Sequence, residues 1–186
     1  SSCSVSTFGG GASSCSYSVL EIDNCYAGIH SGAAQNCDTS TITASNCSAA
    51  SEAGGVRICD DCPSITIDNC TAAEGGGAHT CTNSSFSITN CLATPNEGGG
   101  AFNLNSCSGI IESCTSTATA AGSPYGGGAY RCSNNCILTA SNCYADGRGG
   151  GFSDCLNSTL TVNGCTGVMA GGGVYDSDSC TINANN

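Results

Sequence analysis

An internal repeat marked by cysteine is the feature that most constrains the fold of this 186-residue sequence. Eight cysteines form a first series with steps of 21–23 residues and one step of 29: Cys3, Cys25, Cys47, Cys70, Cys91, Cys114, Cys143 and Cys165. A second series lies about halfway between them, with Cys62 and Cys136 as extra members: Cys15, Cys37, Cys59, Cys62, Cys81, Cys107, Cys132, Cys136, Cys155 and Cys180. Repeats of this length are typical of solenoids, in which stacked units bury a core that no single unit can bury alone.

The residues before each first-series cysteine alternate between apolar and polar. In Thr41-Ile42-Thr43-Ala44 every second side chain is apolar, which is the period of a β-strand, and no stretch has the helical period over three turns. Stacked repeats would add one strand to each sheet every ~4.8 Å. The sequence therefore predicts an all-β protein. We expect one parallel β-helix domain over residues 1–186, with eight coils of about 22–23 residues and an extruded loop at 119–124.

Two other positions repeat with the cysteines. Asparagine precedes most members of the first series and ends the chain: Asn24, Asn46, Asn69, Asn90, Asn142 and Asn186. Ser113 and Gly164 fill the two remaining places. Asparagine and glycine both tolerate positive φ, so this column predicts a left-handed corner in every coil. The glycine clusters, such as Gly75-Gly76-Gly77, predict close backbone approach or a sharp bend at the opposite corner.

The cysteine density indicates an oxidising compartment, so we expect the protein to be extracellular or at a cell surface. Equivalent residues of adjacent coils stack at ~4.8 Å, which lies within the Cα–Cα range of a disulfide. Disulfides between neighbouring coils are therefore expected along both columns, although the pairing cannot be deduced from sequence. Zinc is disfavoured because only Cys59 and Cys62 have CxxC spacing and the chain has two histidines. No metal or cofactor is expected.

The charge balance excludes two classes of partner. Three arginines and no lysine stand against fourteen acidic residues, which gives a net charge of −11. Nucleic-acid backbones and anionic membranes both require clustered basic residues, and no apolar run is long enough to span a bilayer. Neither end carries a polar capping repeat, so the chain is expected to be either a segment of a longer β-helix or a rod that stacks end to end on copies of itself into a filament.

The Gly-Gly-Ala clusters, together with Phe86-Ser87-Ile88-Thr89-Asn90 and Phe102-Asn103-Leu104-Asn105, resemble the polymorphic outer-membrane protein repeats of the pectin-lyase-like superfamily. The resemblance covers all eight repeats. It implies a right-handed parallel β-helix and a non-enzymatic, adhesin-like protein exposed at a surface.

Some acidic residues and both histidines are candidates for chemistry. β-Helix enzymes act on polysaccharides with clustered carboxylates, which here would be Asp60-Asp61 beside Arg57, Asp176 with Asp178, or Asp146 with Arg148 and Asp154. The preferred interpretation is that these are solvated corner residues and that the protein is not an enzyme. Asp176, Asp178, Asp60 and Asp61 also offer oxygen ligands for calcium, but too few for a typical site. His30 and His79 are interpreted as surface residues.

Two kinds of surface site are also indicated. Four N-glycosylation triplets begin at Asn46, Asn69, Asn83 and Asn157, of which Asn83 and Asn157 are the better candidates because they lie outside the asparagine column. Outward positions of the alternating strand carry threonines that could match an ice lattice: Thr41, Thr43, Thr66, Thr139, Thr159 and Thr161. The alternative is that these threonines form the ordinary solvated face of a strand.

Three functions follow in order of preference. The first is a non-enzymatic extracellular structural protein, the subunit of a filament, surface appendage or adhesin, whose partners are copies of itself, attached glycans or a host or cell surface. The second is ice binding through the threonine and serine face. The third, by analogy of fold, is a carbohydrate-active or carbohydrate-binding β-helix.

Overall fold

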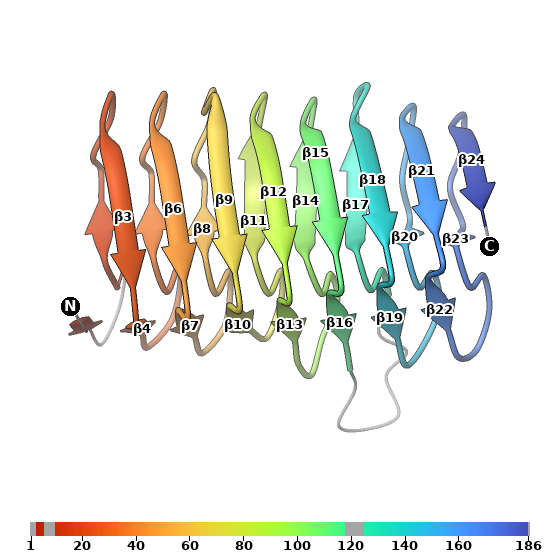
Figure 1. The fold of residues 1–186 in the computed structure, drawn as a ribbon, viewed down its shortest axis with the longest axis horizontal. Helices are drawn as coiled ribbons and strands as arrows, with labels where there is room; N and C mark the ends of the chain where they lie inside the picture. The colour runs from red at the N-terminus through yellow and green to blue at the C-terminus, as the bar shows by residue number, and fades with distance from the viewer. Residues whose placement is uncertain (1–2, 6–9, 118–124, 186) are drawn as a thin grey trace.

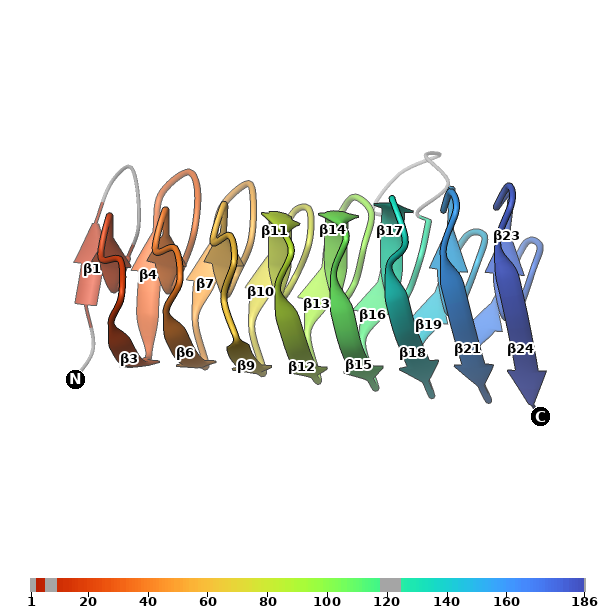
Figure 2. The same ribbon diagram turned by 90° about the horizontal axis from the view of Figure 1, so that it is seen from above.

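The computed structural model describes all residues except 1–2, 6–9, 118–124 and 186. The described chain is all-β, without a helix, and winds into eight right-handed coils that build three parallel sheets (Figures 1 and 2). This confirms the β-solenoid predicted from the cysteine repeat. The loop predicted at 119–124 and the last member of the asparagine column, Asn186, lie outside the described residues.

Each coil contributes one strand to each eight-stranded sheet. Sheet A begins at the first cysteine series and consists of β1 (Cys3–Val5), β4 (Cys25–Ala27), β7 (Ser48–Ala49), β10 (Thr71–Ala72), β13 (Leu92–Ala93), β16 (Thr115–Ser116), β19 (Tyr144–Ala145) and β22 (Thr166–Gly167). Sheet B follows the glycine clusters and consists of β2 (Ala12–Ser13), β5 (Ala34–Gln35), β8 (Val56–Arg57), β11 (Ala78–Thr82), β14 (Ala101–Asn105), β17 (Ala129–Ser133), β20 (Phe152–Ser153) and β23 (Val174–Tyr175). Sheet C contains the alternating segments and consists of β3 (Val19–Asp23), β6 (Thr41–Ser45), β9 (Ser64–Asp68), β12 (Ser85–Thr89), β15 (Ser108–Glu112), β18 (Ile137–Ser141), β21 (Thr159–Asn163) and β24 (Thr181–Asn185).

Sheet C supplies most of the large side chains of the core. Its alternating pattern places every second residue inside the solenoid, and the parallel register aligns Ile67 with Ile88 and Ile88 with Ile111. All three isoleucines are fully buried. Because each coil covers the apolar residues of the coil before it, the core is a continuous column along the axis.

The asparagine column forms the left-handed corner between sheets C and A, as predicted. Its described asparagines have φ between 52° and 55°, and Ser113 (53°) and Gly164 (57°) have the same conformation. The Nδ2 of Asn69 donates to Oδ1 of Asn46 (2.8 Å), while Asn46 and Asn90 donate to Asp23 (2.8 Å) and Asp68 (2.9 Å). The corner is therefore held by side-chain hydrogen bonds that run from coil to coil.

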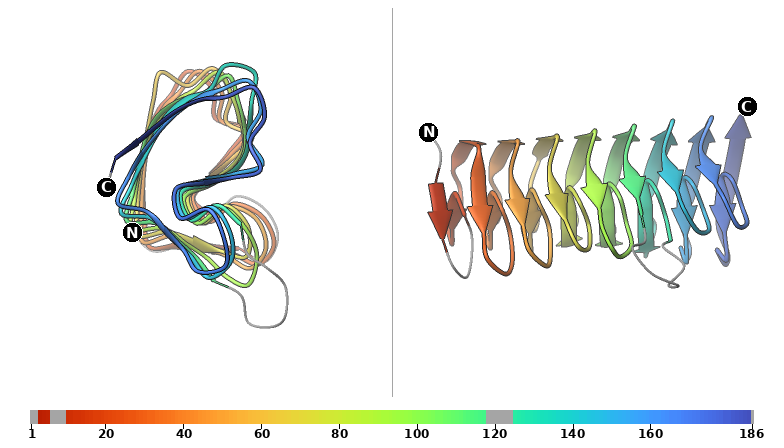
Figure 3. Two further views of the ribbon diagram at one scale, coloured as in Figure 1. Left: turned by 90° about the vertical axis from the view of Figure 1, so that its right-hand side faces the viewer. Right: turned by 90° about the horizontal axis from the view of Figure 1, so that it is seen from below.

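The glycine clusters lie where the chain enters sheet B. A β-carbon placed on Gly76 would lie 2.4 Å from the carbonyl oxygen of Gly99 and 2.5 Å from that of Leu92 in the next coil. Glycine is needed here because the backbone passes directly against β13, and this confirms the predicted close approach. On the other side of this contact the chain forms a smaller lobe, visible when the coils are viewed along the axis (Figure 3).

The cysteines occupy three columns rather than the two expected. The first series stacks in sheet A as predicted, beginning with Cys3 opposite Cys25. The second series divides, because sheet B aligns Cys81 with Leu104, and Leu104 with Cys132. Its true members are Cys15, Cys37, Cys59, Cys81, Cys132 and Cys155. The remaining four cysteines share a column with serines at the corner before sheet C, in the order Ser18, Ser40, Cys62, Ser84, Cys107, Cys136, Ser158 and Cys180.

Disulfide laddering remains a prediction. Cys25 is disulfide-bonded, and the sixteen cysteines from Cys15 to Cys180 other than Cys25 have free thiols. Neighbouring thiols in the first column nevertheless lie within hydrogen-bonding contact, as Cys47 does with Cys70 and Cys91 with Cys114. The side chains are therefore arranged in the order that bonds between adjacent coils would require.

Candidate functional site

The C-terminal edge of the described solenoid exposes apolar side chains that earlier coils bury. Ile182 of β24 has the inward position of its coil and is 45% exposed, whereas Leu160, aligned with it in β21, is fully buried. Val168 and Met169 in the adjacent lobe are 61% and 63% exposed. An apolar strand edge of this kind is a template for pairing with another strand.

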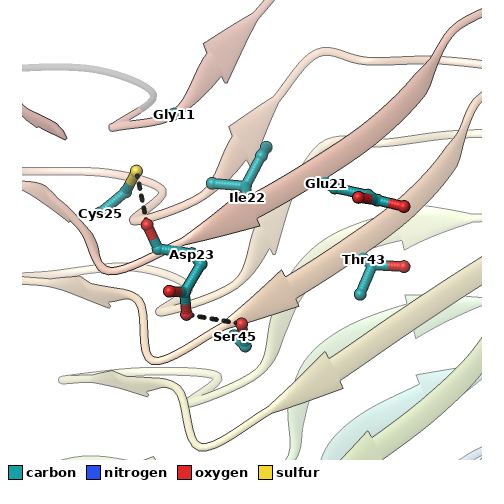
Figure 4. A pocket seen from close by; sticks show the side chains of 7 residues that line it. All are labelled: Gly11, Glu21, Ile22, Asp23, Cys25, Thr43 and Ser45. Atoms are coloured by element: carbon teal, nitrogen blue, oxygen red, sulfur yellow. Dashed lines mark hydrogen bonds between the residues drawn. The ribbon is translucent and has the colours of Figure 1, made fainter. Parts of the chain in front are cut away.

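The opposite edge of the described solenoid has a hollow. A space of about 440 Å³ lies over the edge of β3 and is lined by Gly11, Glu21, Ile22, Asp23, Cys25, Thr43 and Ser45 (Figure 4). Ile22 is half-buried there, although the next member of its column, Ala44, is 1% exposed. The hollow contains both the inward Ile22 and the outward Glu21, so it is the open side of a strand rather than a cleft in the side of the rod.

Polar groups surround the apolar part of this N-terminal edge. The carboxylate of Asp23 accepts hydrogen bonds from the Oγ of Ser45 (2.7 Å) and the Nδ2 of Asn46, and the Sγ of Cys25 lies 3.6 Å from the Asp23 carbonyl oxygen (Figure 4). The hydrogen bonds from Asn46 and Ser45 lower the pKa of Asp23 below its ordinary value. Asp23 therefore stays ionised at this edge under all but acidic conditions.

The predicted threonine face lies on the outer side of sheet C, which faces the viewer in Figure 1. It forms two blocks. Thr43 is aligned with Thr66 in one block, and Thr139 with Thr161 in the other. Between them β12 and β15 carry serines and the outward Ile110, which is 54% exposed. Thr41, Thr43, Thr66 and Thr159 are exposed, whereas Thr139 and Thr161 are partly buried.

All four asparagines of the glycosylation triplets are exposed, but their amides differ in availability. Asn46 and Asn69 use Nδ2 in the corner ladder described above. Asn83 donates its Nδ2 to Asp61 (2.7 Å) from the corner before sheet C. Asn157 lies at the same corner of a later coil, with φ of 49°. Glycan attachment at these positions stays a prediction.

The acidic residues considered for catalysis have separate roles in the coils. Asp60 accepts a hydrogen bond from the backbone amide of Thr82 (2.7 Å), and Asp61 is held by Asn83. Arg57 pairs with Glu52 rather than with the aspartates. Burial raises the pKa of Asp60. These contacts connect successive coils, because Asp60 and Asp61 both accept hydrogen bonds from residues of the next coil.

The other candidates have separate contacts, although Asp154, Asp176 and Asp178 line one hollow. Asp146 accepts from the hydroxyl of Tyr144 (2.6 Å), Asp154 pairs with Arg131 (3.3 Å), and Arg148 lies against two tyrosines. His79 is 7% exposed and stacks on Phe102 with ring centroids 4.8 Å apart, so its expected surface position is wrong. Burial lowers the pKa of His79. His30 is partly exposed and contacts Glu52 (2.8 Å).

Within the described ranges, no group of three or more His, Cys, Asp or Glu side chains could hold a metal ion. The same part of the chain has no helix that is long and apolar enough to cross a membrane. Comparisons with protein families, curated proteins and solved structures find no match to this chain. The fold and its exposed surfaces are therefore the basis for the functional proposal.

Proposed function

We propose that this protein is a non-enzymatic structural rod of the extracellular space or cell surface, which assembles end to end into a filament or appendage. The observation that carries the proposal is that the eight described coils share one register in three parallel sheets, so that one coil can stack on any other. Contact with a further coil would cover Ile182, which is 45% exposed in the last described coil, as β24 covers Leu160.

The two edges of the rod favour another copy of the chain as the source of that coil. The first and last described coils contribute strands to the same three parallel sheets (Figure 2). The first coil of a neighbouring copy could therefore stack on the last described coil in the way that successive coils stack within one chain. Contacts of this head-to-tail kind do not close on themselves and generate filaments. The resemblance to polymorphic outer-membrane protein repeats supports a surface role, and the cysteine content supports an oxidising location.

The experiment compares two substitutions of the same chemistry in the full chain. Ile182→Glu places a charge on the proposed contact edge, whereas Ile137→Glu places the same charge on the outer face of sheet C, where Ile137 is already 63% exposed. Wild-type protein and Ile137→Glu are expected to form long fibres in negative-stain electron microscopy. Ile182→Glu is expected to remain monomeric in sedimentation velocity. A wild-type protein that stays monodisperse at high concentration would refute the proposal.

The outer face of sheet C supports ice binding as a second candidate. Aligned threonines at strand spacing favour it, but Glu21, the serines and Ile110 interrupt the array. Ice binding predicts thermal hysteresis that Thr43→Tyr reduces strongly and that Tyr26→Ala, on sheet A, leaves unchanged. Absence of hysteresis in the wild-type protein would eliminate this function.

A further inference from the structure

The first cysteine column contains one cysteine from every coil, counted from Cys3 in the first coil. From Cys47 to Cys165, each described thiol is in hydrogen-bonding contact with the next, as Cys70 is with both Cys47 and Cys91. Because every junction has such a contact, the contacts alone allow two alternating sets of disulfides in this column.

The bond at Cys25 decides between the two sets. Cys25 is disulfide-bonded, whereas Cys47 in the third coil has a free thiol, so the bond of Cys25 does not join the second coil to the third. The other cysteine aligned with Cys25 is Cys3 in the first coil. Cys47 therefore has only Cys70 as a partner in the column. The pairs that follow are then Cys91 with Cys114 and Cys143 with Cys165.

Two of these pairs have a second contact. The backbone amide of Cys91 donates to Sγ of Cys114 (3.4 Å), and that of Cys143 donates to Sγ of Cys165 (3.3 Å). At the junction between them, Sγ of Cys143 lies 3.5 Å from the carbonyl oxygen of Ile111 instead. The sulfur of the later coil is thus turned toward the earlier cysteine at two junctions where the bond at Cys25 requires a pair.

Serines limit the choice of partner in the other two columns. A serine precedes Cys107 in its column, so the only neighbouring cysteine is Cys136, whose Sγ accepts a hydrogen bond from the Cys107 amide (3.3 Å). A serine also follows Cys155, which leaves Cys132 as the only neighbour of Cys155 in that column. Both pairs join cysteines of successive coils.

Leu104 ends a block of four cysteines in the second column. Cys81 is aligned with Leu104 on one side and therefore has only Cys59 as a partner on the other. Cys37 then pairs with Cys15, with which its thiol is in hydrogen-bonding contact. The two pairs in this block join the first coil to the second and the third coil to the fourth.

We propose that these disulfides lock the oxidised rod into pairs of coils, while Cys62 and Cys180, which have only serines beside them in their column, stay as thiols. No column then bridges the second and third coils or the fourth and fifth. At these two seams only strand hydrogen bonds and core packing hold successive coils together. The proposal shares with the proposed function the need for an oxidising location, but it does not depend on assembly.

Each bond forms by two thiol–disulfide exchange steps with a small disulfide such as oxidised glutathione. One cysteine thiolate attacks a glutathione sulfur, which breaks the glutathione disulfide, releases one glutathione thiolate and leaves a mixed disulfide. The neighbouring cysteine thiolate then attacks the cysteine sulfur of that mixed disulfide and releases the second glutathione thiolate. Two electrons pass from the cysteine pair to glutathione, and the two released thiolates take up the protons that the cysteines lost.

Disulfide mapping of the full chain tests the pairing. The protein is refolded with reduced and oxidised glutathione, alkylated in denaturant without reduction, and digested with pepsin at low pH, where protonation of thiols stops exchange. Mass spectrometry is expected to find Cys91 linked to Cys114, and the alkyl group on Cys62 and Cys180. The proposal would be overturned by a link from Cys70 to Cys91, from Cys114 to Cys143, or from Cys37 to Cys59.

Two serine variants form a matched pair for the first column. Cys91→Ser is expected to release the thiol of Cys114 and to leave Cys70 bonded. Cys70→Ser is expected to release the thiol of Cys47 and to leave Cys91 bonded. Release of the Cys70 thiol by Cys91→Ser would refute the assigned set of pairs, and fibre formation by these proteins is measured separately because it reports on the proposed function alone.

Hydrogen exchange tests the seams. The amides of Leu92 and Thr115 donate to carbonyl oxygens of the preceding coil at the same distance, 2.9 Å, but Leu92 crosses a seam and Thr115 crosses a bridged junction. Because a disulfide restricts local opening, the oxidised protein is expected to protect Thr115 about ten-fold more than Leu92, and reduction is expected to remove most of that difference. A difference that is the same in oxidised and reduced protein would contradict the seams.

Discussion

Substitution of one glycine tests whether successive coils lie as closely as the structure indicates. In Gly76→Ala the added β-carbon would meet two backbone carbonyl oxygens of the next coil at 2.4 and 2.5 Å. Backbone atoms held in a parallel ladder cannot move aside as a flexible side chain can. Overpacking of this kind costs about 1–3 kcal/mol, and we expect the upper end of that range or more.

Gly172→Ala is the matched control. Gly172 has the equivalent position in the last coil, but the nearest atom to its added β-carbon is the Cys165 carbonyl oxygen at 3.5 Å, which is an ordinary contact. At such a site alanine stabilises by about 0.4–1 kcal/mol, because it reduces the conformational freedom of the unfolded chain. The two variants should therefore differ by at least ~2 kcal/mol in the free energy of unfolding.

Chemical denaturation of both variants, in the same redox state as wild type, measures this difference. Equal shifts for Gly76→Ala and Gly172→Ala would refute the reasoning. The two variants also test assembly. Within the chain, a β-carbon on Gly150 would lie 2.4 Å from the carbonyl oxygen of Gly172 in the next coil. A neighbouring copy stacked on the last coil would bring an equivalent carbonyl oxygen against a β-carbon at position 172. Gly172→Ala is thus expected to fold normally and to form fewer fibres.

Three other outcomes are expected. Ile67→Ala should lower the free energy of unfolding by about 2–5 kcal/mol in urea titrations, because Ile67 is fully buried, and a loss below 1 kcal/mol would contradict its place in the core. Because hydrogen bonds lower the pKa of Asp23 in the folded protein, its ionised carboxylate stabilises the fold at pH values above the pKa of the unfolded state. This stabilisation is lost as the pH falls and the carboxylate becomes protonated. The melting temperatures of wild type and Asp23→Asn should therefore converge below about pH 4, and a constant gap across pH would contradict this coupling. In reduced protein, alkylation followed by mass spectrometry should modify Cys180 before Cys81, whose burial raises the pKa of its thiol and blocks access; the reverse order would contradict the register.

The coils could be predicted from the sequence because every repeat must meet the same requirements for stacking. Stacking requires the same backbone conformation at the same place in every coil, so Asn46, Asn69 and Asn90 recur at the left-handed corner and alternating residues recur in sheet C. Period and phase could be read directly from these positions. The short strands of sheets A and B contain two or three residues in many coils, too few for a periodic signal.

The division of the second cysteine series was missed because only the mean spacing was used. Cys107 lies seven residues before Cys114, as Cys136 lies seven before Cys143, and this shared interval marks both as members of the serine column. Leu104 fills the vacated core position because an aliphatic side chain can replace a thiol in a buried column. Aligning from the following cysteine would have revealed the three columns.

The tyrosine cluster on the outer side of sheet B had no signal in the sequence. Tyr125, Tyr130 and Tyr175 are separated by up to 50 residues and become neighbours only when coils stack. Burial of His79 was missed for a related reason: it points outward from sheet B, but Phe102 of the next coil covers it. Such surfaces depend on which side chains follow one another along the axis, and no single repeat contains that information.

Cryo-electron microscopy of assembled wild-type protein tests end-to-end stacking most directly. Continuous stacking of coils predicts filaments with a strong layer line near ~4.8 Å and an axial subunit repeat of roughly 38 Å, which is eight coils at that spacing. Isolated particles of one rod length, or filaments with a break in the strand spacing at every subunit boundary, would contradict it.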